Sequence, residues 1–208
     1  MEAFETWPHV FVPGEPGTPV VLALHGTGAD EHDLLGLVAT LSPGSPVISP
    51  RGRVSEHGMN RWFRRMGEGV FDVEDVIARA AELAGFVTDA LAHYDLKGRP
   101  LVAVGFSNGA NIATATALLH PEVLDTVLAF SGMYPFADQD PMEDVSGVRL
   151  FLANGESDPM APGVSVERLD TIATQHRATV TRLTRPGGHG ITEDEVAQAV
   201  SWLSPREA

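Results

Sequence analysis

The hydrophobic positions of the chain follow two spacings in turn. Short, unbroken apolar runs predict buried strands, such as PVVLAL at 19–24, whereas apolar residues recurring three or four positions apart predict a long helix over 72–93. The segment 9–12, bracketed by Pro8 and Pro13, predicts an edge strand. The other predicted strands are 46–49, 101–105, 123–130, 148–153 and 179–183, and the other predicted helices are 108–119, 164–176 and 192–203.

Alternation of strands and helices predicts the fold class. Strands that are apolar throughout are typical of a mostly parallel α/β sheet with helices on both faces. Ligands bind to such sheets beyond the carboxyl ends of the strands, so chemically active side chains should directly follow strands. At roughly 150 residues per domain, the 208 residues predict a single domain over 1–208.

Composition and charge exclude several classes of function. Acidic residues outnumber basic residues 28 to 14, and the net charge of −14 disfavours nucleic-acid and anionic membrane partners. The absence of cysteine excludes disulfides, thiolate metal sites and a cysteine nucleophile. Because the acidic start lacks the pattern of a signal peptide and no apolar run approaches about 20 residues, we expect a cytoplasmic protein without a membrane partner.

The segment GFSNG at 105–109 matches the pattern G-x-S-x-G of a nucleophilic serine. It follows the predicted strand 101–105 and opens the predicted helix 108–119, which is the strand–turn–helix setting that the pattern requires. Small residues at such a turn allow backbone and helix to approach each other. We therefore predict that Ser107 stands at a helix N-terminus, where an oxyanion is favoured.

A serine nucleophile needs a base and an acid that orients the base. In this fold the order along the chain is serine, acid, histidine. His189 lies in a glycine-rich loop directly after a strand and is predicted as the base, whereas His120 and His176 lie at helix ends.

The acid should follow an earlier strand than the histidine does. Asp158 follows the predicted strand 148–153 and is the preferred candidate, with Glu156 as the local alternative and Asp138 or Asp140 as more distant ones. Two backbone N–H groups should stabilise the oxyanion, one from Asn108 and one from Thr27 in the loop HGTG.

Five motifs in order carry a resemblance to a known family. The segments LALHGTGADEHDLLGL, SPRG with RWF, GFSNGANIA, NGESDP and GGHGI resemble the bacterial phospholipase/carboxylesterase family of small α/β-hydrolases, from about residue 20 to residue 202. The resemblance implies Ser107, Asp158 and His189 as the catalytic triad, oxyanion donors at Thr27 and Asn108, and a homodimer. Related acyl-protein thioesterases usually carry Leu and Gln where Thr27 and Asn108 stand, so the chain is more similar to the bacterial subgroup.

The substrate side of the site is predicted from two segments. Residues 131–147 are too few for a folded cap domain, so we expect an open cleft. Residues 51–71 follow a strand and should border this cleft. The apolar side chains proposed to bind substrate are Met59, Trp62, Phe63, Met133 and Met160, with Trp62 and Phe63 equally compatible with a core position.

Other polar clusters have simpler interpretations. Arg53, Arg61, Arg64 and Arg65 either attract anionic substrates or, as we favour, pair with the surplus carboxylates. The run 30–33 resembles metal ligands but is predicted to be a solvated loop or helix start, because adjacent positions do not converge on one ion. His25 is predicted to be structural.

The sequence therefore predicts a serine carboxylesterase that acts on small to medium esters through an acyl-enzyme, with no cofactor or metal. The alternatives within the fold are a thioesterase or a lysophospholipase. The alternative from another class is a ligand-binding protein without catalysis.

Overall fold

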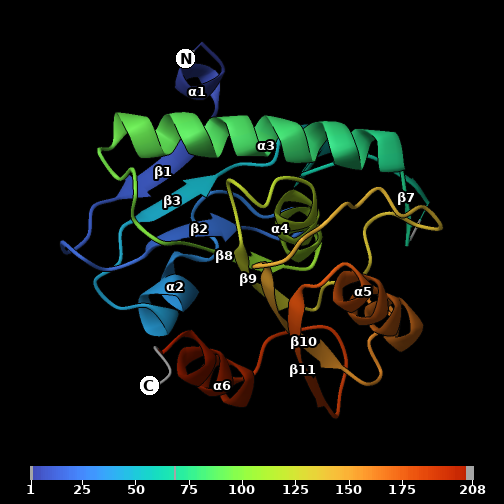
Figure 1. Cartoon of the computed structure of the whole chain (residues 1–208). Coiled ribbons are helices and arrows are strands. Elements are labelled where there is room, and N and C mark those ends of the chain that lie inside the picture. The colour runs from blue at the N-terminus through green and yellow to red at the C-terminus, as the bar shows by residue number, and fades with distance from the viewer. Residues whose placement is uncertain (1, 68, 205–208) are drawn as a thin grey trace.

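A central sheet of seven strands organises the computed structural model, which describes residues 2–67 and 69–204 (Figure 1). The β1 strand pairs antiparallel with β3, and all other neighbours in the sheet are parallel. The prediction of a mostly parallel α/β sheet is confirmed, while the predicted domain over 1–208 extends beyond the described residues. In sheet order the strands are β1 (His9–Val12), β3 (Val47–Pro50), β2 (Val20–Leu24), β8 (Leu101–Phe106), β9 (Thr126–Phe130), β10 (Arg149–Gly155) and β11 (Thr179–Arg185).

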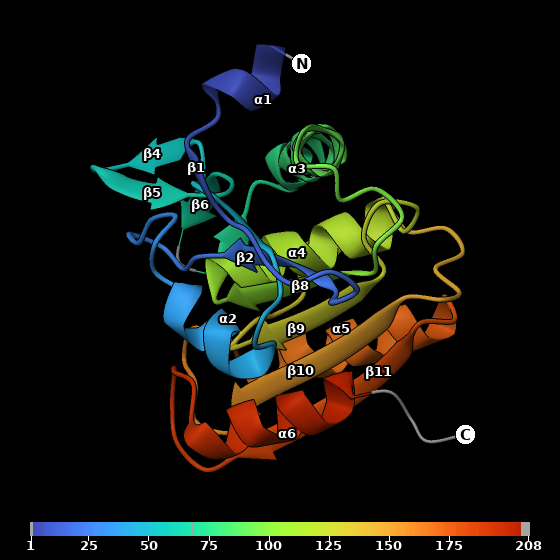
Figure 2. The same ribbon diagram turned by 90° about the vertical axis from the view of Figure 1, so that its left-hand side faces the viewer.

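Helices cover both faces of this sheet (Figure 2). One core is shared by α3 (Val73–His93), α4 (Asn108–Leu119) and α5 (Gly163–Gln175), and the other by α2 (Leu35–Leu41) and α6 (Glu193–Leu203). Alternate residues of β2 enter the two cores, with Leu22 in the first and Val21 in the second. Burial on both sides explains the unbroken apolar runs, and each fully buried aliphatic side chain contributes about 1.5–3 kcal/mol.

The α4 helix is buried almost all round. It packs between α3 and the strands β8 and β9, and its residues 108–118 are all buried. Its composition of alanine and threonine lets it lie close to the sheet, with its N-terminus directly beyond β8.

Two helices were not predicted from the sequence. The short α1 (Glu2–Thr6) lies beside α3 (Figure 1), where Phe4 packs against Phe86 with ring centroids 5.5 Å apart. The α2 helix buries Val38 and Leu41 over the second core.

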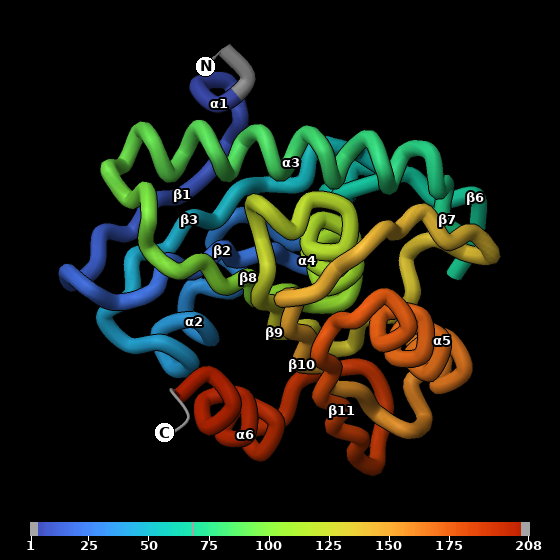
Figure 3. The backbone as a smooth tube through the Cα atoms, in the orientation of Figure 1, coloured from blue at the N-terminus to red at the C-terminus, as the bar shows by residue number. Residues whose placement is uncertain are grey.

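Residues 51–72, beyond the carboxyl end of β3, form two small hairpins. Their strands are β4 (Val54–Glu56) with β5 (Met59–Arg61), and β6 (Arg65–Gly67) with β7 (Val70–Phe71). Residues 131–148, between β9 and β10, contain no helix or strand and pass near β7 (Figure 3). The prediction that no cap domain enters here is confirmed. Within the described residues, no helix has the length and apolar character needed to cross a membrane.

Candidate active site

Ser107 occupies a strained turn between β8 and α4. Its backbone has φ 53° and ψ −116°, and its carbonyl accepts the first turn's hydrogen bond from Asn111 N at 3.0 Å. Ser107 N donates to Phe130 O on the neighbouring strand β9 at 2.9 Å, which fixes the turn against the sheet. Positive φ at a residue with a side chain costs about 1–3 kcal/mol and is typical of functional turns.

Two glycines make this turn possible. A Cβ atom on Gly109 would lie 1.9 Å from Leu24 O, and one on Gly105 would lie 2.5 Å from Gly109 O. The backbone of α4 therefore approaches the end of β2 as closely as atoms allow. This contact brings the turn at Ser107 beside the loop 25–28, as the sequence predicts for a nucleophile and its oxyanion loop.

Asp158 and His189 are joined by a hydrogen bond across the ends of β10 and β11. His189 Nδ1 lies 2.8 Å from Asp158 Oδ2, and the Asp158 carboxylate is fully buried. Its other oxygen, Oδ1, accepts from Met160 N at 2.8 Å and from Ala161 N at 3.2 Å. The carboxylate is thereby oriented, and a proton on Nδ1 leaves Nε2 of His189 free to take part in proton transfer.

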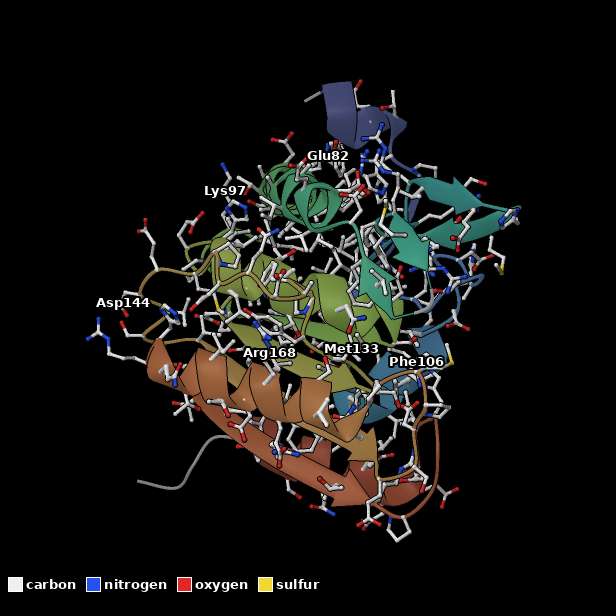
Figure 4. All side chains as sticks on the ribbon, turned by 90° about the vertical axis from the view of Figure 1, so that its right-hand side faces the viewer. Glu82, Lys97, Phe106, Met133, Asp144 and Arg168 are labelled. Atoms are coloured by element: carbon white, nitrogen blue, oxygen red, sulfur yellow. The ribbon has the colours of Figure 1, made fainter. Side chains whose placement is uncertain are left out.

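The His189 ring lies next to the turn of the serine. Its centroid is 5.0 Å from that of Phe106, the residue before Ser107, which is labelled in Figure 4. Among the described residues, Ser107 Oγ forms no hydrogen bond with the imidazole. Such bonds are often long in unliganded enzymes and tighten when substrate is present.

The alternative acids and bases lie elsewhere. His176 pairs with Asp140 at 2.8 Å, and this contact raises the pKa of His176. His120 lies 3.6 Å from Glu122, while Asp138 and Glu156 are exposed. Of the carboxylates weighed from the sequence, Asp158 is therefore the one that the fold brings to His189.

The loop 26–29 and Asn108 are held by one neighbouring segment. Asn60 spans the loop, since its O accepts from Gly28 N at 2.9 Å and its Nδ2 donates to Ala29 O at 2.8 Å. Among residues 2–67 and 69–204, the backbone N–H groups of Thr27 and Asn108 donate no hydrogen bond, so both remain available to an oxyanion.

The same segment contacts the two predicted donor residues through their side chains. Arg61 Nη1 donates to Thr27 Oγ1 at 3.0 Å, and Trp62 N donates to Asn108 Oδ1 at 2.8 Å. The sequence does not predict Asn60 and Arg61 as supports of the site. Their polar side chains follow no periodic pattern, so only the folded hairpin reveals the contact.

Trp62 and Phe63 belong to the core, so their proposed role in binding substrate is wrong. Their exposed fractions are 2% and 0%, and both side chains pack into the first core cluster. Trp62 also donates from Nε1 to His25 O at 2.8 Å. The apolar pair stabilises the segment 59–63 and presents no surface to a ligand.

The three methionines predicted to bind substrate differ in position. Met59 is 37% exposed and lies over Gly28 of the loop 26–29, and Met160 is 45% exposed. Met133 is labelled in Figure 4 and lines a cavity of about 370 Å³. The cavity is bounded by β7, the segment after β9 and the start of α5, and its side chains are mostly apolar; it is lined by Gly69, Phe71, Met133, Tyr134, Ala137, Pro159, Pro162, Val164 and Ser165.

His25 is structural, as predicted. The imidazole is buried, Nδ1 lies 2.7 Å from Gly26 O, and Nε2 accepts from Gly52 N at 2.9 Å. Burial lowers the pKa of His25, which keeps the ring neutral and suits it to accept one hydrogen bond while it donates the other. The ring thus connects the loop 26–29 to the chain that leaves β3.

The arginines at 53, 61, 64 and 65 pair with carboxylates rather than form a free positive patch. Arg64 contacts Asp72 at 3.0 Å, and Arg65 contacts Glu56 at 3.0 Å. Arg53 and Arg61 have longer ion pairs, to Glu82 at 3.9 Å and to Glu56 at 3.7 Å. The favoured prediction of a salt-bridged surface is confirmed, although Arg61 itself is buried.

The expectation that adjacent positions at 30–33 do not converge on one ion is wrong. Ligand atoms of Asp30, Glu31 and His32 lie within 4.8 Å of one another, so adjacent residues do converge here. Glu31, however, is bound by two nitrogens of Arg51, at 2.5 and 2.6 Å, and this contact lowers the pKa of Glu31. Asp30 Oδ1 accepts from His32 N at 2.9 Å. These contacts explain the cluster as a loop held by an ion pair.

Comparison with known proteins identifies the family. The model of the phospholipase/carboxylesterase family matches residues 5–205. The chain is 34% identical to "Putative hydrolase MhqD" of Bacillus subtilis (strain 168), over 93% of this chain and 96% of that protein. The crystal structure of the Bacillus cereus carboxylesterase has 38% identity and a TM-score of 0.89, covering 95% of this chain and 93% of that one. A carboxylesterase from Mesorhizobium loti has 29% identity and a TM-score of 0.88, covering 95% and 94%. The chain therefore belongs to the phospholipase/carboxylesterase family of hydrolases and has the α/β-hydrolase fold.

Proposed function

We propose that the protein is a serine carboxylesterase that hydrolyses small to medium carboxylic esters through an acyl-enzyme. The observation that carries the proposal is the buried Asp158 carboxylate hydrogen-bonded to His189, whose ring lies beside the turn at Ser107. Membership of a hydrolase family and the similarity to structures named carboxylesterase support it.

In the proposed reaction, His189 Nε2 takes the proton of Ser107 as Oγ attacks the ester carbonyl. Asp158 holds the imidazole and stabilises its positive charge. The N–H groups of Thr27 and Asn108 donate to the tetrahedral oxyanion, and the N-terminus of α4 adds its positive dipole.

The intermediate then collapses in the second half of the reaction. His189 returns the proton to the alkoxide, which leaves as the alcohol while the acyl group stays on Ser107. A water molecule, activated by the same imidazole, attacks the acyl-enzyme and releases the carboxylic acid. Each proton removed by His189 is thus returned to a leaving group, and the resting enzyme is restored.

The cavity of about 370 Å³ supports the expected size of substrate. Pro159 in its wall directly follows Asp158, and Met133 lies just after β9, so the cavity adjoins the acid loop. Its volume is at the small end of ligand pockets and its lining is mostly apolar, which suits a short acyl or alcohol group.

Two paired measurements test the proposal. Turnover of p-nitrophenyl acetate and butyrate by the wild-type protein should fall at least about a thousandfold in Ser107→Ala. The control is Ser146→Ala, an exposed serine whose side chain takes no part in the site. Equal turnover by wild type and Ser107→Ala would contradict the serine mechanism.

Matched oxygen esters and thioesters with the same acyl group separate the alternatives. A carboxylesterase should prefer the oxygen ester in kcat/KM, and a thioesterase the sulfur analogue. A lysophospholipase should instead release fatty acid from a single-chain phospholipid faster than from either.

A further inference from the structure

The loop that carries His189 is rich in glycine, so its own sequence does not hold it in one conformation. It reads PGGHG over 186–190, and three of these five residues are glycines. Gly187 has φ 107° and Gly190 has φ 157°, conformations that other residues rarely adopt. Glycine loses more conformational freedom on folding than any other residue, so contacts from outside must hold this loop in place.

The Arg185 side chain supplies several of these contacts. Arg185 ends β11, and its guanidinium donates to three carbonyls of the loop that follows. Nη1 donates to Pro186 O at 3.2 Å, while Nη2 donates to Gly188 O at 3.1 Å and to Gly190 O at 2.9 Å. The last two carbonyls belong to the residues on either side of His189. The loop 186–190 therefore curves around the planar guanidinium of Arg185.

Glu195 holds this cation from the opposite side. Arg185 Nε lies 2.9 Å from Glu195 Oε2 in an ion pair that lacks the alignment of a hydrogen bond, and the exposed fractions of the two side chains are 16% and 1%. Oε2 also accepts from Thr192 N at 2.7 Å and from Thr192 Oγ1 at 2.9 Å, which completes the capping box of α6. Among the described residues, Glu195 Oε1 is buried without a hydrogen-bond partner. Arg185 is thus the one basic side chain that compensates this buried charge within the described residues.

The loop is also attached to the strands that carry the other site residues. Ser131 Oγ, just after β9, donates to Gly190 O at 3.0 Å. Ser157 N, next to Asp158, donates to Gly187 O at 2.9 Å. These bonds fix the edges of the loop, whereas within residues 2–67 and 69–204 only Arg185 donates to the carbonyls on both sides of the histidine.

We propose that Arg185, held by Glu195, is a positioning residue that keeps the His189 imidazole in its bond to Asp158. The inference rests on the proposed serine esterase function. Arg185 acts through the backbone of the loop and contacts no reacting atom. A purely stabilising ion pair between β11 and α6 would not need three bonds to the loop carbonyls.

The test uses the double variant Arg185→Met with Glu195→Gln. It removes the guanidinium without leaving an unpaired buried carboxylate, and glutamine can still serve in the capping box. We expect kcat on p-nitrophenyl butyrate to fall about 10-fold to 100-fold with KM nearly unchanged, because a small displacement of the base slows proton transfer without altering binding. The single variant Arg185→Lys keeps the charge but lacks the forked guanidinium. Its kcat should therefore lie between that of the wild type and that of the double variant.

Two matched variants control for stability and charge. Arg182→Met removes an arginine from the same strand, where it pairs with Asp170 at 3.6 Å. Asp72→Ala removes the N-cap of α3, which covers the other face of the sheet from α6 and leaves the contacts of Arg185 and Glu195 unchanged. Both variants should keep kcat within about twofold, even though Asp72→Ala loses about 1 kcal/mol of stability, or about fivefold in the folding equilibrium.

A second readout does not depend on turnover. The proton on His189 Nδ1 should give a low-field NMR resonance in the wild-type protein and in both controls, and this resonance should be lost or broadened in the double variant. A double variant that is folded and retains both the resonance and the wild-type kcat would overturn the proposal. If instead the wild-type protein showed no esterase activity, the proposed function would fail, while the resonance would still decide the role of Arg185.

Discussion

Trp62 donates its backbone N–H to the side-chain oxygen of Asn108 at 2.8 Å, and both residues are buried. A residue of the hairpin segment thereby fixes the position that follows the proposed nucleophile, 46 residues further along the chain. Since the Asn108 backbone N–H is a proposed oxyanion donor, the bond couples the hairpin to the chemistry.

Replacement of Asn108 by alanine should separate this support from the donor itself. The variant keeps the backbone N–H but leaves the buried Trp62 N–H without its acceptor, which costs about 1–3 kcal/mol. We expect the urea midpoint to fall and kcat to decrease about tenfold, because the donor is less well placed. A variant with unchanged stability and kcat would show that the bond has no supporting role.

Gly155 should be needed for the close approach of the loop that carries Asp158 to the histidine loop, residues 186–190. A Cβ atom there would lie 2.4 Å from both Gly187 O and Gly188 O, so Gly155→Ala must push the backbone of the histidine loop away. We expect a stability loss of about 1–3 kcal/mol and a clear drop in kcat. Denaturant unfolding and ester turnover measure the two effects.

Gly85→Ala is the matched control for this substitution. Gly85 lies inside α3, is exposed, and a Cβ atom there would contact nothing within 4 Å. Alanine should stabilise the protein by about 0.5–1 kcal/mol and leave kcat unchanged. If both alanine variants behaved alike, close packing at Gly155 would not be the cause.

The Asp140–His176 pair should stabilise the protein below neutral pH. Its contact raises the pKa of His176 above the ordinary value of 6.5. The stabilisation is therefore fully present below about pH 6.5 and is lost as the pH rises through the folded-state pKa. His176→Gln should lower the free energy of unfolding at pH 5.5 by at most about 1 kcal/mol, because the pair is partly exposed, and should have little effect at pH 8.5.

The buried His25 acts in the opposite direction but does not disturb this comparison. Burial lowers the pKa of His25, so the unfolded chain takes up a proton near pH 6.5 that the folded protein does not, and stability falls as the pH decreases further. This loss occurs equally in wild type and His176→Gln and cancels in their difference. An equal effect of His176→Gln at both pH values would contradict the assignment.

The sequence predicted the sheet well because strands that are buried on both faces are apolar at consecutive positions, and such runs are easy to recognise. It also predicted which serine, aspartate and histidine stand at strand ends, since a parallel sheet brings those ends together. The α2 helix was missed because it is short, contains Gly36, lacks a side-chain cap, and buries only Val38 and Leu41.

The sequence could not distinguish a pocket wall from a core at Trp62 and Phe63. Both environments favour large apolar residues, and only the fold shows that these two side chains face inward. The hairpins of residues 54–71 are short and mostly polar, so they carry no periodic signal. The supports of the site at Asn60 and Arg185 depend on contacts with backbone atoms, and Arg61 contacts the hydroxyl of Thr27 from a distant part of the chain; residue types reveal neither kind of contact.

Covalent labelling with an active-site-directed fluorophosphonate tests the central claim most directly. A reactive serine displaces fluoride and forms a stable phosphonyl ester, which peptide mass spectrometry can locate. The account predicts one label, on the peptide that contains Ser107, and labelling at least about a hundredfold slower in His189→Ala. Labelling at another residue, or none under conditions where the protein is folded, would contradict it.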